Sequence, residues 1–242
     1  MPLSSVDLEP CYVLHTRLYG DTSLLVTVLT KTHGKLTLIA RGARKISKSK
    51  KNPRYLLQPF IPLLLSWQGK SSLKTLTSME ADAPSINLIG NRLYSAMYLN
   101  ELLVYLLHEE DPSDDTFDYY QEVLPLLSDV GTSLEVTLRQ FEFTLLATLG
   151  YEINFECNAE NFQPLDPAAS YYYFPEQGFI DIRVYPKARD IGFLGEDLLR
   201  IHHHDYSSPS TRQTAKYIAR AALRPHLRNR TLKSRELFLK HY

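Results

Sequence analysis

The chain has 242 residues, of which 44% are hydrophobic and 22% charged, a balance typical of a globular protein with a sizeable core. Its longest apolar runs, such as 102–107, are too short to cross a membrane, and the opening MPLSSVDLEP does not resemble a secretory signal. Because its two cysteines, Cys11 and Cys157, would form one disulfide at most, we expect free thiols and a cytoplasmic protein.

The formal net charge of zero conceals three blocks of opposite sign. Residues 1–80 contain 12 Lys and Arg against 4 Asp and Glu, residues 206–242 contain 9 against 1, and residues 81–205 contain 6 against 22. Between Asp21 and Glu80 there are eleven Lys and Arg and no acidic residue. A solvated basic surface is one interpretation, but so long an acid-free stretch favours binding to nucleic acid.

The first 80 residues are expected to form strands. Short segments rich in Leu, Val, Ile and Thr are separated by turn signals such as Gly20-Asp21 and Gly69-Lys70. The expected strands are 12–18, 23–31, 35–40, 60–67 and 73–79. Five short strands fit a small closed barrel of either the OB or the SH3-like kind, because closure leaves no exposed edge strand.

From Asn91 onward the apolar residues recur with a helical period. The expected helices are 91–106, capped by Asn91; 116–127, interrupted by Pro125; 132–149; and 210–223, limited by Pro225. Thr132 with Glu135, and Ser210 with Gln213, have the spacing of a capping box at the start of the third and fourth helices.

The segment 151–190 is irregular, aromatic-rich and broken by four prolines. Residues 171–174 and 179–185 are expected to form a hairpin around Glu176-Gln177-Gly178. The sequence therefore predicts an α+β multidomain protein. A barrel spans 1–80, and a mainly helical domain with a small β insert spans 81–242, ending in a basic helical region at 210–242.

A loop between the third and fourth strands carries seven cations and no acid. With Lys35 on the preceding strand, the candidate phosphate ligands are Lys35, Arg41, Arg44, Lys45, Lys48, Lys50, Lys51 and Arg54. Such side chains contact phosphate without reading base sequence, so they do not separate DNA from RNA. A plain solvated loop is the alternative.

The last expected helix offers a second basic surface. Arg212, Lys216, Arg220 and Arg224 recur every four residues, so they share one slowly drifting face of the helix. Ala215, Ile218, Ala219 and Ala222 occupy the opposite face, which is suited to packing. An amphipathic surface helix without any ligand is the alternative interpretation.

The sequence motifs of common enzymes are absent. No phosphate-binding P-loop precedes Gly34-Lys35, because Leu29 stands where its first glycine belongs, and neither G-x-S-x-G nor H-E-x-x-H occurs. The run 202–204 holds three consecutive histidines, which cannot all point at one metal ion, and a solvated loop is the simpler interpretation. These absences favour a binding protein without catalysis and without a cofactor.

Several phrases resemble the RecO family of recombination mediators. They are YVLHTR (12–17), DTSLL (21–25), GKLTLIARGAR (34–44), LQPFIPLLL (57–65), LYSAMYLNEL (93–102), LRQFEFTLL (138–146) and LKSRELF (232–238). The resemblance covers nearly the whole chain and implies an N-terminal OB barrel. Many family members carry a four-cysteine zinc site after the third helix. Since only Cys157 lies there, this chain resembles the zinc-free branch, with 151–190 a degenerate zinc-finger-like segment.

The same resemblance implies a role in RecF-pathway DNA repair and recombination. The family binds single- and double-stranded DNA, anneals complementary strands and, with RecR, helps RecA replace the single-stranded-DNA-binding protein SSB. The resemblance also offers a role for Arg139, which is to take the C-terminal carboxylate of the SSB tail in a bidentate fashion. The simpler alternative is an ion pair with Glu135 or Glu142. An RNA-binding or ribosome-associated OB protein, or a scaffold, are the other functions considered.

Overall fold

The structure is a computed structural model that describes residues 5–44, 55–184, 192–228 and 230–239. The chain forms two compact units, of which the first comprises residues 1–132 with 232–242, and the second residues 133–231. The predicted boundary near residue 80 marks a different feature, which is the change from strands to helices. That change falls between Ala81 and Asn91.

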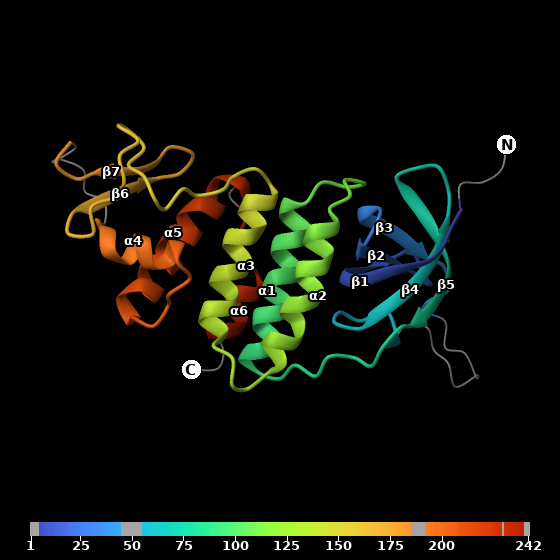
Figure 1. The fold of residues 1–242 in the computed structure, drawn as a ribbon. Coiled ribbons are helices and arrows are strands. Elements are labelled where there is room, and N and C mark those ends of the chain that lie inside the picture. Colours follow the sequence, from blue (N-terminus) through green and yellow to red (C-terminus); the bar gives the residue numbers. More distant parts are fainter. Residues whose placement is uncertain (1–4, 45–54, 185–191, 229, 240–242) are drawn as a thin grey trace. The chain divides into compact units, whose positions relative to one another are not determined.

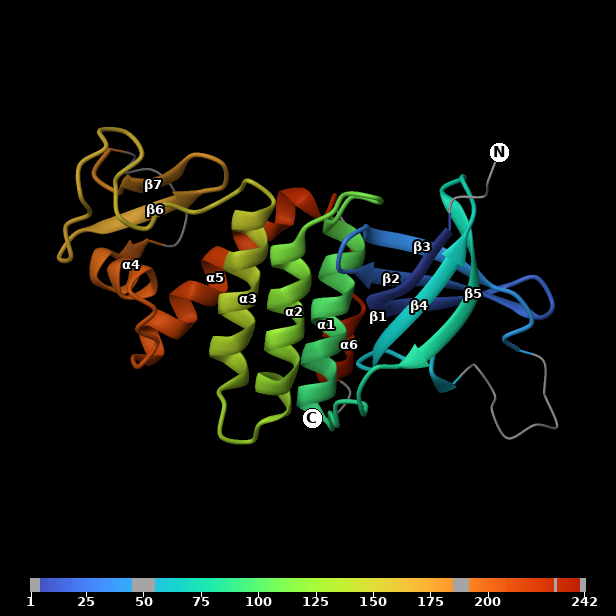
Figure 2. The same ribbon diagram turned by 45° about the vertical axis from the view of Figure 1, so that its right-hand side comes forward.

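The N-terminal strands close into a five-stranded barrel of the OB type (Figures 1 and 2). They are β1 (Ser5–Tyr19), β2 (Ser23–Thr30), β3 (Gly34–Ala40), β4 (Pro62–Gln68) and β5 (Leu73–Ala81). The order around the barrel is β1-β2-β3-β5-β4, and the β3–β5 pair is parallel while the others are antiparallel. The predicted barrel is confirmed, and this order of strands distinguishes the OB from the SH3-like alternative.

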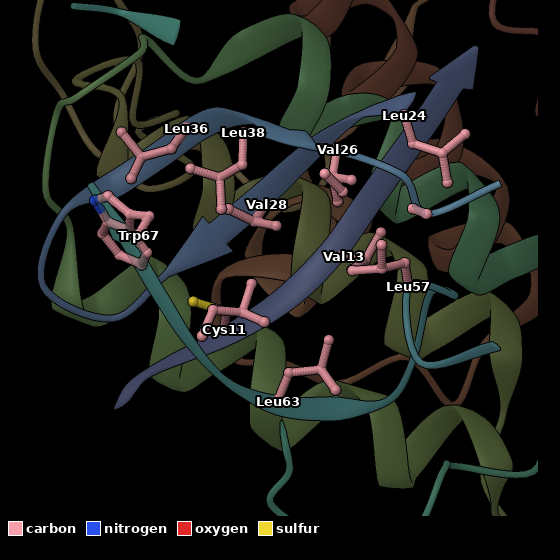
Figure 3. Packing of buried hydrophobic residues seen from close by; sticks show 13 residues of the cluster. Cys11, Val13, Leu24, Val26, Val28, Leu36, Leu38, Leu57, Leu63 and Trp67 are labelled. Atoms are coloured by element: carbon pink, nitrogen blue, oxygen red, sulfur yellow. The ribbon is translucent and has the colours of Figure 1, made fainter. Parts of the chain in front are cut away.

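The barrel is filled by alternate residues of its strands, which point inward (Figure 3). The buried cluster includes Cys11, Val13, Leu24, Val26, Val28, Leu36, Leu38, Leu57, Leu63, Leu65 and Trp67. Burial of side chains of this size contributes about 1.5–3 kcal/mol each relative to exposure.

The middle of β1 is buried on its outward side as well, because helices cover it. Helices α1 (Asn91–Leu106) and α2 (Asp114–Ser128) belong to the same unit as the barrel. The ring of Tyr12 lies 5.6 Å from that of Phe117 and 5.2 Å from that of Tyr120, between ring centroids. The Asn100 side-chain amide donates to the Leu14 carbonyl at 3.1 Å and accepts from the Tyr120 hydroxyl at 2.5 Å.

The C-terminal helix α6 (Ser234–Leu239) packs on α1 within the first unit. The Glu101 carboxylate accepts hydrogen bonds from the backbone N–H groups of Lys233 and Ser234, both at 2.9 Å, and from the Ser234 hydroxyl at 2.6 Å. A side chain of α1 therefore caps the start of α6, where backbone donors have no partner within the helix.

The second unit combines three helices with a small sheet. The helices are α3 (Leu134–Thr148), α4 (Gly195–His202) and α5 (Pro209–His226), and the strands are β6 (Ser170–Phe174), β7 (Gly178–Asp181) and β8 (Phe193–Leu194). The predicted hairpin is confirmed as β6–β7, although its second strand ends at Asp181 and is shorter than expected. Strand β8 adds on the other side of β6. A cluster that includes Phe155, Phe179, Leu198 and Ile218 forms the core of this unit.

The predicted caps are wrong in detail. Gly90, not Asn91, precedes the first turn of α1, and the residue before α3 is Ser133. The Thr132 hydroxyl donates to Asp129 at 2.7 Å, and that of Ser210 donates to Asp197 at 2.9 Å, so neither completes a capping box. Pro125 lies inside α2, near its C-terminal end, rather than interrupting it, whereas α5 ends one residue after Pro225, as expected.

Candidate nucleic-acid interface

Helix α5 presents three of the four predicted cations to solvent. Lys216, Arg220 and Arg224 are exposed, whereas Ala215, Ile218, Ala219 and Ala222 on the opposite side are buried. Successive cations stand four residues apart, which is about 6 Å along a helix axis. The exposed face of α5 is therefore a row of positive charges that a phosphate backbone can follow. We call Lys216, Arg220 and Arg224 the α5 row.

Arg212, the fourth predicted cation of this helix, is held by the protein itself. Its Nη1 donates to the backbone carbonyls of Tyr206 and Ser207, both at 2.8 Å, and its Nε lies 3.6 Å from a carboxylate oxygen of Glu135. The guanidinium thus fixes the loop that leads into α5. Part of its charge is therefore already paired within the protein.

In the barrel, the described part of the basic loop lies against the β1–β2 turn. Arg44 is held there by two hydrogen bonds. Its backbone N–H donates to the Thr22 carbonyl at 3.0 Å, and its Nη1 donates to the Gly20 carbonyl at 3.1 Å. Arg41 is exposed beside it, as is Tyr19 at the end of β1. The predicted ligands Lys45, Lys48, Lys50, Lys51 and Arg54 lie outside the described residues.

Lys35 does not fit its predicted role as a phosphate ligand. The side chain is buried, and its ammonium donates to the backbone carbonyls of Val104 and Leu107 at 2.7 and 2.5 Å. These carbonyls belong to the last turn of α1 and the residue after it, where the helix dipole favours a cation. Lys35 therefore binds the barrel to the end of α1 rather than facing a ligand.

The face of β2 and β3 is closed to a ligand as well. The outward-pointing side chains of this face are buried: Leu25, Leu29 and Ile39 are 6%, 2% and 9% exposed. At the edge of this face, the Thr37 hydroxyl donates to Glu109 at 3.1 Å, and Glu110 pairs with Lys74. OB barrels commonly bind oligonucleotides through these two strands. Here burial and the acidic side chains make this face unsuited to a polyanion.

Arg139 on α3 forms a buried ion pair. Its Nη2 lies 2.7 Å from Oε1 of Glu142, and the two side chains are 7% and 0% exposed. Of the two partners anticipated from the sequence, Glu142 is correct, whereas Glu135 lies beside Arg212. Nε and Nη1 of Arg139 are buried and find no hydrogen-bond partner among the described residues. Buried donors left without an acceptor cost free energy, so Glu142 alone does not satisfy this guanidinium.

The segment after α3 is shaped by asparagine side chains. Oδ1 of Asn154, Asn158 and Asn161 each accepts a backbone N–H two residues further on, at 2.9, 2.9 and 3.0 Å. Cys157 is a free, half-buried thiol. Over the described ranges, no three His, Cys, Asp or Glu side chains are grouped closely enough to hold a metal ion.

The run 202–204 is not the simple loop that the sequence indicated. His202 is the last residue of α4, and its Nε2 lies 3.3 Å from a carboxylate oxygen of Glu156.

Cys11 is free and buried in the barrel. Burial, and to a smaller extent the charge of Glu9, raises the pKa of its thiol well above the usual value. No helix of the described chain is long and apolar enough to span a membrane.

An OB-type barrel and a helix with a row of exposed cations are features typical of nucleic-acid-binding proteins. Comparison with known proteins identifies the family to which the chain belongs. Residues 7–84 match the family described as Recombination protein O N terminal, and residues 90–236 match Recombination protein O C terminal. The chain belongs to the RecO family of DNA repair proteins.

Named relatives are similar over almost their whole length. The DNA repair protein RecO of Cellvibrio japonicus is 46% identical over 235 residues, which cover 96% of this chain and 97% of the relative. That of Haemophilus influenzae (strain Rd) is 44% identical, with 96% and 95% covered. That of Tolumonas auensis is 42% identical, with 98% and 96% covered.

Proposed function

We propose that this chain is a cytoplasmic, non-enzymatic mediator that binds single- and double-stranded DNA and anneals complementary strands. Together with RecR it would help RecA to replace SSB. The observation that carries the proposal is the α5 row, in a chain that belongs to a family of DNA repair proteins. Phosphate contacts of this kind are independent of base sequence, as an annealing protein requires.

Annealing needs two strands to approach against their mutual repulsion. The chain carries cations in both units, with Arg41 and Arg44 beside the β1–β2 turn and the α5 row in the second unit. Neutralising phosphates on each strand would lower the repulsion that opposes pairing. Exposed acids on α2, such as Asp115 and Glu122, repel DNA and leave that helix for protein partners.

The direct test is strand annealing on oligonucleotides coated with SSB. The wild-type chain should accelerate the pairing of complementary strands without ATP, and the rate should fall in the triple variant Lys216→Ala, Arg220→Ala, Arg224→Ala. Arg200→Ala is the matched control, because Arg200 is a helical cation of the same unit that pairs with Glu196. Acceleration that is the same in all three proteins would argue against the α5 row. Wild-type protein that fails to anneal would refute the proposed function.

DNA binding should depend steeply on salt concentration. If about five phosphates are contacted, log K should fall against log salt with a slope of about −3 to −5. Replacing Lys45, Lys48, Lys50 and Lys51 by Ala should flatten that slope and weaken all sequences alike. Arg44 is left in place because it holds the β1–β2 turn. Titrations at several salt concentrations should include the triple α5 variant. A slope that neither variant changes would place the phosphate contacts elsewhere.

We further propose that Arg139 takes the terminal carboxylate of the SSB tail. Support comes from its two buried nitrogens without a partner among the described residues, since a carboxylate is the acceptor that such donors lack. Lys at this position keeps the charge but loses the planar fork of donors. Arg139→Lys should therefore weaken binding of an SSB-tail peptide about tenfold and leave binding of bare single-stranded DNA within twofold.

The measurement is a titration of labelled tail peptide into both proteins. Arg200→Lys serves as the control, because it alters an exposed helical pair, with side chains 37% and 52% exposed, by the same chemistry. If Arg139→Lys bound the peptide as tightly as the wild type, Arg139 would be only a partner of Glu142.

A further inference from the structure

A groove of about 390 Å³ runs along the exposed side of α5 in the second unit. Its lining comprises Glu135, Pro209, Arg212, Gln213, Lys216, Tyr217 and Arg220. Six of these seven residues come from α5, and Glu135 comes from the first turn of α3. The groove is therefore a feature of one helix face, and it contains two members of the α5 row.

Tyr217 is the aromatic ring of this groove. It is the single Tyr, Phe or Trp of α5, and it remains 43% exposed among the otherwise polar side chains of that face. The residue before it is Lys216, and Arg220 lies three residues later, on the adjacent turn. A flat, partly exposed ring between two exposed cations is the combination that proteins use to stack a base while holding its phosphates.

The charges of the groove are unequal along its length. Arg212 is anchored by two backbone carbonyls and lies near Glu135, so this end is close to neutral. The free positive charge begins at Lys216 and continues through Arg220 to Arg224. An anionic strand would consequently lie along the C-terminal part of the groove, where Tyr217 stands between Lys216 and Arg220.

We propose that Tyr217 and its flanking cations form a site specific for single-stranded nucleic acid. A base would stack on the Tyr217 ring, while Lys216 and Arg220 hold the phosphates on either side. In a duplex both faces of each base are already stacked inside the helix, so the ring has nothing to engage and only the cations contribute. This inference rests on the proposed DNA-binding function and adds to it a basis for preferring single strands.

The test compares Tyr217→Ala with Tyr217→Phe, which keeps the ring and removes the hydroxyl. Affinities of the full chain are measured for a single-stranded oligonucleotide carrying 2-aminopurine and for a duplex of the same length. Tyr217→Ala should weaken single-strand binding about 5- to 150-fold, the effect of losing one stacked base, and leave duplex binding within twofold. Tyr217→Phe should bind as the wild type does, and quenching of the 2-aminopurine should be lost in Tyr217→Ala alone.

Tyr151→Ala is the matched control. Tyr151 is 47% exposed in the same unit but lies outside the groove, with its ring 3.9 Å from that of His226 between centroids. Its replacement should change neither affinity. Equal weakening of single strands and duplex in Tyr217→Ala, or no weakening of either, would overturn the site. Wild-type protein that binds neither DNA would instead refute the proposed function, so the two failures are distinguishable.

Discussion

Gly34→Ala is expected to lower the free energy of unfolding of the first unit by about 2–5 kcal/mol, from steric overlap and backbone strain together. Gly34 begins β3 with φ of +67°, a conformation that side chains disfavour. A Cβ atom there would lie 2.2 Å from the backbone oxygen of Asp111, far inside van der Waals contact. The segment after α1 would have to leave β3, and the bonds from Lys35 to the end of α1 would weaken with it.

Gly20→Ala is the control that separates the cost of backbone strain from the cost of steric overlap. Gly20 also has a positive φ, +54°, but no atom lies within 4 Å of its Cβ position, so only the backbone cost of about 1 kcal/mol remains. Urea unfolding followed by fluorescence is a suitable measurement, because the single tryptophan, Trp67, is buried in the barrel. Equal midpoints for the two variants would mean that the approach of Asp111 to β3 contributes little to stability.

Arg139→Ala is expected to destabilise the second unit by about 3–5 kcal/mol, because it removes the cation beside the fully buried carboxylate of Glu142. The comparison is Arg200→Ala, which removes a pair of the same type from an exposed helix surface, where about 0.3–0.5 kcal/mol is expected. Helical circular dichroism in urea measures both. If the two variants unfolded alike, the Arg139 pair would have to be solvated rather than buried.

This expectation also decides how the SSB-tail hypothesis is tested. The Arg139→Ala substitution is expected to destabilise the second unit, which would lower peptide binding for a reason unrelated to recognition. Arg139→Lys keeps a cation for Glu142 and alters only the donor geometry. The conservative substitution is therefore the informative one.

The barrel was predictable because its signals are local. Strand alternation and turn glycines define β2, β3, β4 and β5, and each predicted strand lies within two residues of the observed one at both ends. The extension of β1 back to Ser5 was missed, since it depends on pairing with β4 more than fifty residues away. The short helix α4 was missed, and α6 was expected only as part of a helical region over 210–242, because one or two turns are stabilised mainly by what they pack on.

Which individual charged side chains are buried and which are exposed could not be predicted in the same way. Lys35 and Arg41 lie on one basic stretch, and nothing in that stretch indicates that Lys35 is buried against the end of α1 while Arg41 is exposed. The α5 face was predictable, since its cations repeat every four residues opposite alanines. The proposed role of Tyr217 could not be predicted, because it depends on a groove that is formed partly by Glu135 from another helix.

The capping of α6 by Glu101 has a consequence for the order in which the chain acquires its structure. The hydrogen bonds between them join residues 132 and 133 positions apart. A chain emerging from the ribosome exposes its N-terminus first, so the barrel and α1 are made long before the segment that completes their unit. All of the second unit is synthesised in between. Because Ser234 follows Glu101 by 133 positions, α1 meets this partner only after the whole second unit has been synthesised.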